Sequence, residues 1–158
     1  MRSFPNERIE QLVKKYSPGL LRFAFAYLKD HSESQDVVQE AFIKCIKKQP
    51  VFSNEAQEKA WFYKVTSNHC KDILKSSRRK KEQPVTEDID EIEMPEQTHI
   101  LNYVLSLEQK YRIPVHLYYY EGYSIKEIAE LIKVNPSTVA THLDRARQKL
   151  KEVMGEEV

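Results

Sequence analysis

Two stretches of this 158-residue chain carry side chains suited to binding nucleic acid. Between residues 52 and 75, aromatic residues alternate with lysines; aromatic faces stack on unpaired bases while ammonium groups hold phosphates. The candidate contacts in this stretch and directly after it are Lys59, Trp61, Lys64, Asn68, Lys71, Lys75, Arg78 and Arg79. Between residues 137 and 149, small polar side chains and cations share one face of an expected helix, which suits a major groove. The candidate contacts there are Ser137, Thr138, Thr141, His142, Arg145 and Lys149.

No catalytic or metal-binding pattern accompanies these two stretches. His69 and Cys70 are adjacent, so on a helix they point about 100° apart and make a poor nucleophile–base pair. The five histidines show no i, i+4 spacing, and no glycine-rich phosphate loop is present. The sequence therefore predicts a binding protein rather than an enzyme, with no cofactor and no metal. An enzyme on a helical scaffold is the least favoured alternative.

The second stretch lies in a predicted helix-turn-helix. Ser124 and Glu127 have the spacing of a capping box, and Asn135-Pro136 predicts an N-cap followed by proline at the first helical position. Two capped helices joined by a short turn are typical of the unit that reads duplex DNA. An ordinary amphipathic helix pair is the alternative. The residues of the second helix expected in the core are Val139, Leu143, Ala146 and Leu150.

The first stretch ends a predicted four-helix bundle. Apolar periodicity places the helices at about 6–16, 20–29, 32–48 and 55–77, with a break at Ser17-Pro18-Gly19. Ser32 and Gln35 are read as the capping box of the third helix. We expect Trp61, Phe62 and Val65 to belong mainly to the core, because aromatic and apolar residues at helical spacing usually pack inside.

Composition indicates two domains of helix only. The chain has three glycines, fewer than a strand-rich fold needs for its turns. Residues 1–81 carry 17 Lys and Arg against 9 Asp and Glu, residues 82–98 carry 7 acids and no Lys or Arg, and residues 99–158 are balanced. The predicted organisation is a domain at 1–81, a flexible acidic linker at 82–98 and a domain at 99–158. Pro114 should kink or interrupt a helix expected at 108–120.

Cysteine use and hydropathy indicate the cytoplasm. Cys45 and Cys70 form no CxxC pair and are read as reduced, partly buried thiols. Neither a signal peptide nor an apolar run of about 18 residues is apparent, so we expect no membrane insertion.

Short motifs in both halves resemble those of one bacterial family. In the second half they are Arg112, Glu121-Gly122, Glu127-Ile128-Ala129-Glu130, Thr138-Val139 and Arg145-Ala146-Arg147-Gln148-Lys149-Leu150. In the first half they are Asp36-Val37-Val38-Gln39-Glu40-Ala41-Phe42, Trp61, Val65, Asn68, Asp72 and Arg78. Together they are similar to the extracytoplasmic-function (ECF) sigma factors, minimal subunits that direct RNA polymerase to promoters. The likeness covers nearly the whole chain.

The resemblance implies a role for each region. Asp36, Gln39 and Glu40 match positions that dock on the clamp helices of core RNA polymerase; the alternative is that Asp36 favours its helix N-terminus and the other two are merely solvated. The first domain becomes sigma region 2, which melts and captures the single-stranded −10 element. The second becomes sigma region 4, whose helix-turn-helix reads the −35 duplex. The linker is either a mimic of RNA charge inside the polymerase or a soluble tether.

The resemblance also implies regulation. A membrane-anchored anti-sigma factor would hold the chain until a stress signal arrives. One departure bears on DNA affinity, because Ala140 and His142 stand where relatives often carry basic residues. The affinity for the −35 duplex should then either depend more on Arg145, Arg147 and Lys149 or be weak without polymerase. A stand-alone helix-turn-helix regulator with a ligand-sensing or dimerising bundle is the main alternative function.

Overall fold

The computed structural model describes residues 6–76 and 98–154. Every regular element within these ranges is helical, which confirms the all-α class. The chain divides into two compact units, Met1–Ile92 and Glu93–Val158, and each is described by itself. The acidic linker predicted at 82–98, together with Arg78 and Arg79, falls almost wholly outside the described residues.

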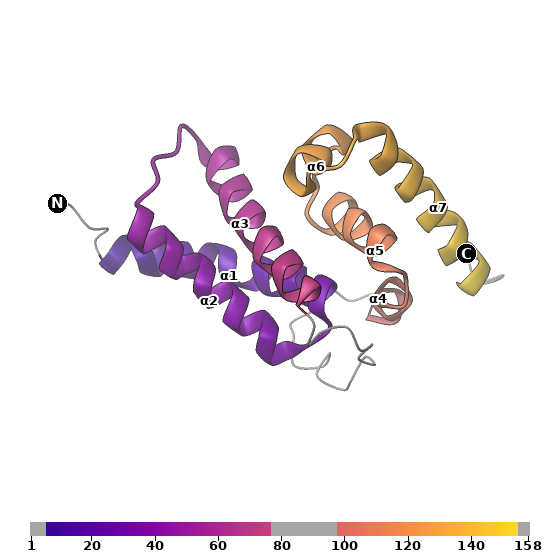
Figure 1. Cartoon of the computed structure of the whole chain (residues 1–158), viewed down its shortest axis with the longest axis horizontal. Helices are drawn as coiled ribbons and strands as arrows, with labels where there is room; N and C mark the ends of the chain where they lie inside the picture. The colour runs from indigo at the N-terminus through magenta and orange to yellow at the C-terminus, as the bar shows by residue number, and fades with distance from the viewer. Residues whose placement is uncertain (1–5, 77–97, 155–158) are drawn as a thin grey trace. The chain divides into compact units, whose positions relative to one another are not determined.

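The first unit consists of helices α1 (Asn6–Leu28), α2 (His31–Lys48) and α3 (Glu55–Lys75), each packed against the other two (Figure 1). Aromatic rings fill the centre. Phe62 stacks on Tyr16 and lies against Phe42, with ring centroids 5.0 and 5.1 Å apart, and Phe23 lies 5.1 Å from Tyr63. Burial of these large rings supplies much of the apolar surface that a three-helix unit needs for stability.

The break predicted between two N-terminal helices does not occur, so the described part of this unit has three helices rather than four. Pro18 lies inside the continuous helix α1 and its side chain is exposed. Proline costs a helix one backbone hydrogen bond. Leu12 and Tyr16 before it and Leu20 and Phe23 after it are all buried, however, and we attribute the continuity to the packing of this shared stripe.

The cap of α2 also differs from the prediction. Asp30, not Ser32, is the N-cap, and its carboxylate accepts a hydrogen bond of 2.8 Å from the Glu33 N–H. Ser32 lies within the first turn and is exposed. Aspartate is as good an N-cap as serine, so local sequence alone did not separate the two choices.

The second unit contains α4 (Thr98–Leu105), α5 (Gln109–Val115), the π-helical segment η3 (His116–Tyr120), α6 (Ile125–Ile132) and α7 (Pro136–Met154). The interruption expected at Pro114 takes the form of a change in hydrogen bonding. Pro114 lacks the N–H that would bond to the fourth preceding carbonyl. Directly after it the chain adopts the wider π register, in which the Glu121 N–H bonds to the His116 carbonyl at 3.2 Å.

Helices α6 and α7 form the predicted helix-turn-helix (Figure 1). The capping box is present: Ser124 Oγ accepts from the Glu127 N–H at 3.1 Å, and Glu127 Oε1 accepts from the Ser124 N–H at 2.9 Å. The left-handed backbone of Lys133 ends α6, and α7 begins at Pro136. Among residues 6–76 and 98–154, no helix is both long enough and apolar enough to cross a membrane.

Candidate functional site

The exposed face of α7 contains the residues predicted to read duplex DNA. Val139, Leu143 and Ala146 are buried as predicted, which turns the opposite face outward. Of the candidates, Ser137, Thr141, Arg145 and Lys149 are exposed, whereas Thr138 and His142 are half-buried. Leu150, expected in the core, is half-buried as well. The six candidates therefore lie on one continuous surface that runs from the outward face to one flank of the helix.

Asn135 caps the first turn of α7, which is exposed. Asn135 Oδ1 accepts from the Ser137 N–H at 3.1 Å and from the Ser137 hydroxyl at 2.9 Å. Pro136 has no N–H to satisfy. The exposed N-terminus thus keeps its partial positive charge next to small side chains, an arrangement that favours a phosphate.

One flank of α7 rests on a tyrosine of α5. The ring of Tyr111 is buried, and the His142 ring meets it edge-to-face with the two centroids 5.5 Å apart. The ammonium groups of Lys149 and Lys110 lie 5.6 and 5.2 Å from the same centroid. Desolvation, followed by the nearby charges of Lys110 and Arg145, lowers the pKa of His142. His142 is therefore neutral at pH 7 and does not replace a missing cation.

The other flank of α7 rests on a tyrosine of η3. Arg147 Nε donates a hydrogen bond of 2.7 Å to the Tyr119 hydroxyl oxygen, and its guanidinium carbon lies 5.8 Å from the centroid of that ring. Tyr119 is 53% exposed. Sequence reasoning missed Tyr111, Tyr119 and Lys110. Tyr119 contacts Arg147, Tyr111 contacts His142 and Lys149, and the charge of Lys110 acts on His142, so each interaction joins residues about 30 or more positions apart.

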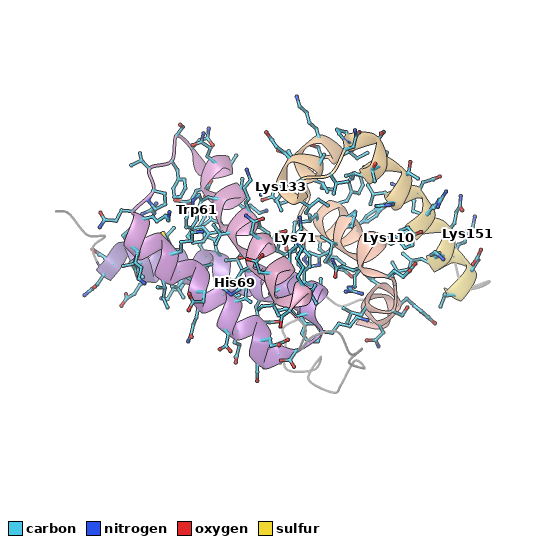
Figure 2. The ribbon with its side chains drawn as sticks, in the orientation of Figure 1. Trp61, His69, Lys71, Lys110, Lys133 and Lys151 are labelled. Carbon is cyan, nitrogen blue, oxygen red and sulfur yellow. The ribbon has the colours of Figure 1, made fainter. Side chains whose placement is uncertain are left out.

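On α3, most of the predicted −10 contacts form one stripe. At about 100° per residue, Trp61, Lys64, Asn68, Lys71 and Lys75 fall within a sector of about 80°. Lys64 and Lys75 are exposed, and the other three are half-buried. Figure 2 labels Trp61 and Lys71 at two points along this helix. Lys59 lies on the opposite side of α3, with its ammonium 5.6 Å from the buried ring of Tyr63, so it does not join the stripe.

The aromatic end of this stripe includes a residue from the preceding loop. Phe52 meets Trp61 edge-on with centroids 6.0 Å apart, and Trp61 in turn meets Phe62 at 5.0 Å. Phe62 and Tyr63 are fully buried, so they are core residues rather than stacking partners. Phe52 and Trp61 are the two aromatic rings that remain partly accessible here.

A polar cluster fixes the first turn of α3 to α1. Glu58 is buried and accepts hydrogen bonds from Tyr16 at 2.7 Å and from Arg8, while Lys15 pairs with Glu55 and approaches Glu58 at 3.4 Å. Burial alone would raise the pKa of Glu58, but the Tyr16 and Arg8 hydrogen bonds outweigh it and lower the pKa. Burial, reinforced by Glu58, raises the pKa of Tyr16 to about 12.

The docking candidates lie on the exposed side of α2. Asp36, Gln39 and Glu40 are all exposed, opposite the buried residues Val37 and Ala41. Further along α2, the same exposed face includes Ile43 and Ile46, which are 40% and 42% exposed. A polar half followed by an apolar half is a surface composition typical of protein–protein contact.

Neither cysteine is activated. Cys45 and Cys70 are buried, and desolvation raises the pKa of the Cys45 thiol to about 11 and raises that of Cys70 as well. Both are therefore protonated at pH 7 and are weak nucleophiles. Within the described ranges, no three His, Cys, Asp or Glu side chains gather closely enough to hold a metal ion.

Comparison with known families matches both units. Residues 12–80 match sigma-70 region 2, and residues 99–150 match sigma-70 region 4. Among curated relatives, RNA polymerase sigma factor SigV of Bacillus subtilis is 29% identical over 146 residues, which cover 88% of this chain and 86% of SigV. The ECF RNA polymerase sigma factor SigM of the same organism is 24% identical, with 90% and 93% coverage.

Solved structures share the fold at low identity. The sigma factor RpoE from Bartonella quintana, in complex with the anti-sigma factor NepR, superposes with a TM-score of 0.72 at 19% identity, covering 94% of this chain and 97% of that one. CnrH, in complex with the cytosolic domain of CnrY, superposes with a TM-score of 0.66 at 21% identity, covering 94% and 89%.

Proposed function

The chain belongs to the sigma-70 family, as an ECF-type RNA polymerase sigma factor, and we propose that three of its surfaces divide the work of initiation. It binds core RNA polymerase and promoter DNA, and it directs promoter-specific transcription initiation. In our proposal residues 1–81 act as region 2, residues 82–98 as an acidic linker and residues 99–158 as region 4. The two family matches lie inside the two outer segments, which supports this division.

The α3 stripe captures the −10 element in this proposal. Phe52 and Trp61 offer ring surface for an unstacked base, Asn68 offers an amide for a base edge, and the lysines of the stripe follow the phosphates. Arg78 and Arg79 would extend the same charge beyond α3. This stripe is the observation that carries the proposal, since a regulator that only reads duplex DNA needs no aromatic and cationic surface of this kind.

The −35 duplex is read by α7. Ser137, Thr138 and Thr141 face the base edges near the helix N-terminus, and Arg145 and Lys149 meet the phosphate backbone. His142 contributes shape rather than charge at neutral pH. The chain supplies binding, while the polymerase performs the chemistry of synthesis.

In this proposal Asp36, Gln39 and Glu40 on α2 dock on core polymerase. The variant Glu40→Lys tests this assignment. Charge reversal at an interface that meets cations weakens association, so we expect the Kd for core polymerase to rise about tenfold or more. The matched control is Glu7→Lys, the same change at an exposed position of α1. Binding is measured by titrating labelled core enzyme, and specific transcripts from a cognate promoter provide the functional readout. Equal Kd values for the two variants would contradict the docking assignment.

An anti-sigma factor is the proposed regulator. RpoE and CnrH, which share this fold, were solved with the anti-sigma factor NepR and with the cytosolic domain of CnrY. We propose that a membrane-anchored protein holds this chain in the cytoplasm, where polymerase and DNA are found, and releases it during a stress response. Co-purification with a membrane fraction that is lost on stress would support this regulation.

A further inference from the structure

The contact between Tyr119 and Arg147 arranges several hydrogen-bond donors at the surface. The Tyr119 hydroxyl oxygen accepts from Arg147 Nε at 2.7 Å, so the proton of that hydroxyl points elsewhere. With Nε occupied, the two terminal nitrogens of the guanidinium keep their donors. The side chain of Arg147 is 47% exposed and Tyr119 is 53% exposed. The Tyr119 O–H and the Arg147 N–H groups lie beside a fixed positive charge, and such a set of donors suits a single oxyanion.

The position of this pair on α7 relates it to the DNA-reading face. At about 100° per residue, Arg147 lies about 60° around the helix from Asp144, and it is separated from His142 by about 220° across the exposed side of α7. Ser137, Thr141 and Arg145 lie between the Arg147 flank and the His142 flank. A major groove is bounded by two phosphate backbones, so a helix that enters it presents its two flanks to phosphates.

Arg147 also compensates for a neutral position on its own flank. Ala140 lies two turns earlier on α7, about 20° around the helix from Arg147. Ala140 offers no charge to the backbone on this side, and Arg147 is the nearest cation along that line of the helix. Its guanidinium is held in place by Tyr119, which reduces the side-chain entropy lost on binding.

We propose that Tyr119 and Arg147 together bind one phosphate of the −35 duplex, with Tyr119 positioning the guanidinium and donating its own hydroxyl proton. The inference deepens the proposed function, since it assumes that α7 reads this duplex. A phosphate is favoured over a base edge because the pair lies on a flank of α7, where a phosphate backbone borders the groove, and because it combines donors with a positive charge. Asp144 lies 4.0 Å from Arg147 Nη1, and its carboxylate competes with the phosphate.

A double-mutant cycle in the full chain tests the proposal. Tyr119→Phe, Arg147→Ala and the double variant are titrated against a labelled −35 duplex at several salt concentrations. We expect about a threefold loss for Tyr119→Phe and about a tenfold loss for Arg147→Ala, with the salt slope of the latter reduced by about 0.9. The double variant should lose less affinity than the product of the two single losses, because the tyrosine acts partly through the arginine.

The adjacent tyrosine provides the matched control. Tyr120→Phe makes the same chemical change in the same π-helical segment, where Tyr120 stacks on His116 instead. Its affinity should be unchanged, and thermal melting of all variants separates lost contacts from lost folding. A second variant, Arg147→Lys, should keep the salt slope but become less sensitive to Tyr119→Phe, since a lysine has no guanidinium Nε for the hydroxyl to position.

Three outcomes would overturn the inference. Multiplying losses in the double variant would mean that the two residues act separately. Unchanged duplex affinity in Arg147→Ala, together with weaker core binding, would assign the pair to a carboxylate of the polymerase. An effect of Tyr120→Phe equal to that of Tyr119→Phe would indicate a general change in the segment. Arg145→Ala is measured in parallel: if it too leaves the duplex affinity unchanged, the −35 assignment of α7 has failed rather than this inference alone.

Discussion

The two units of this chain hold cations at their surfaces in different ways. In the first unit, Arg8 and Lys15 of α1 donate to the buried carboxylate of Glu58. In the second, Arg147 and Lys149 of α7 lie against the rings of Tyr119 and Tyr111. A carboxylate cancels the charge of the cation that it holds, whereas a tyrosine ring orients a cation and leaves its charge available. In these two clusters, therefore, the cations beside Glu58 have their charge balanced within the fold, whereas Arg147 and Lys149 keep their charge available for a ligand.

This difference matches the position of each group relative to the proposed surfaces. The Glu58 cluster fixes the first turn of α3 to α1, and the stripe that we propose for the −10 element begins one turn later at Trp61. In the second unit the supporting tyrosines sit beside the DNA-reading face itself. Tyr111 is 4% exposed, so one side chain contributes to the core and also supports Lys149.

The largest effect is expected when the Glu58 carboxylate, which holds the cations of the first unit, is removed. Glu58→Ala leaves the buried Tyr16 hydroxyl without its acceptor and removes the partner of the half-exposed Arg8, and we expect the first unit to lose about 3 kcal/mol of unfolding free energy. Trp61, the single tryptophan of the chain, reports on this unit by fluorescence during urea unfolding. The control is Glu55→Ala: its side chain is 72% exposed, and the expected loss is below about 1 kcal/mol.

The same carboxylate predicts a pH dependence. The pKa of Glu58 in the folded chain is below its ordinary value of 4.5, so the stabilisation is present above that value and is lost as pH falls through the lower folded pKa. The difference in unfolding free energy between the original chain and Glu58→Ala should shrink below about pH 4.5. A constant difference down to pH 3 would mean that the cluster acts by packing rather than by charge.

A smaller effect is expected at Asp144, whose carboxylate approaches the guanidinium of Arg147. Asp144→Asn removes the negative charge 4.0 Å from Arg147, and we expect affinity for the −35 duplex to increase about two- to threefold at low salt. The control is Glu130→Gln on the exposed face of α6. Tighter binding that persists equally at high salt would argue against an electrostatic cause.

The smallest expected effect concerns His142. Its pKa is lowered by desolvation and by nearby Lys110 and Arg145, so the unfolded chain takes up a proton at a higher pH than the folded chain. The second unit should therefore lose stability, by less than about 1 kcal/mol, as pH falls below the ordinary value of 6.5. His142→Gln should flatten this dependence. NMR titration of the imidazole would contradict the argument if its midpoint lay above 6.5.

Local signals were enough to predict the helix-turn-helix. Ser124 with Glu127 and Asn135 with Pro136 sit three and one residues apart, so each cap is decided within a single turn, and both are present. The break at Pro18 was predicted on the same local basis and was wrong, because packing of residues on either side of the proline extends across the unit. Local reasoning is reliable where the interacting residues are neighbours in sequence.

The candidate contact residues also divide into those that local sequence predicts and those that depend on distant packing. Helical spacing alone predicted the exposed Ser137, Thr141 and Arg145, whereas the docking residues, which are exposed too, were identified from the family resemblance. It could not separate Lys59 from the other lysines, since the distinction depends on its contact with the buried Tyr63. Their roles in binding remain predictions that the variants above address.

The π-helical segment η3 has a consequence for how such a protein changes over generations. A π turn is an α-helix that has gained one residue. Loss of one residue between Val115 and Ser124 would restore ordinary pairing and rotate Tyr119 about 100° relative to the helix-turn-helix that follows. Its hydroxyl would then leave Arg147, although α7 would keep its entire sequence. Insertion and deletion in this short segment are thus a route by which promoter affinity can be retuned without any substitution in the helix that reads the promoter.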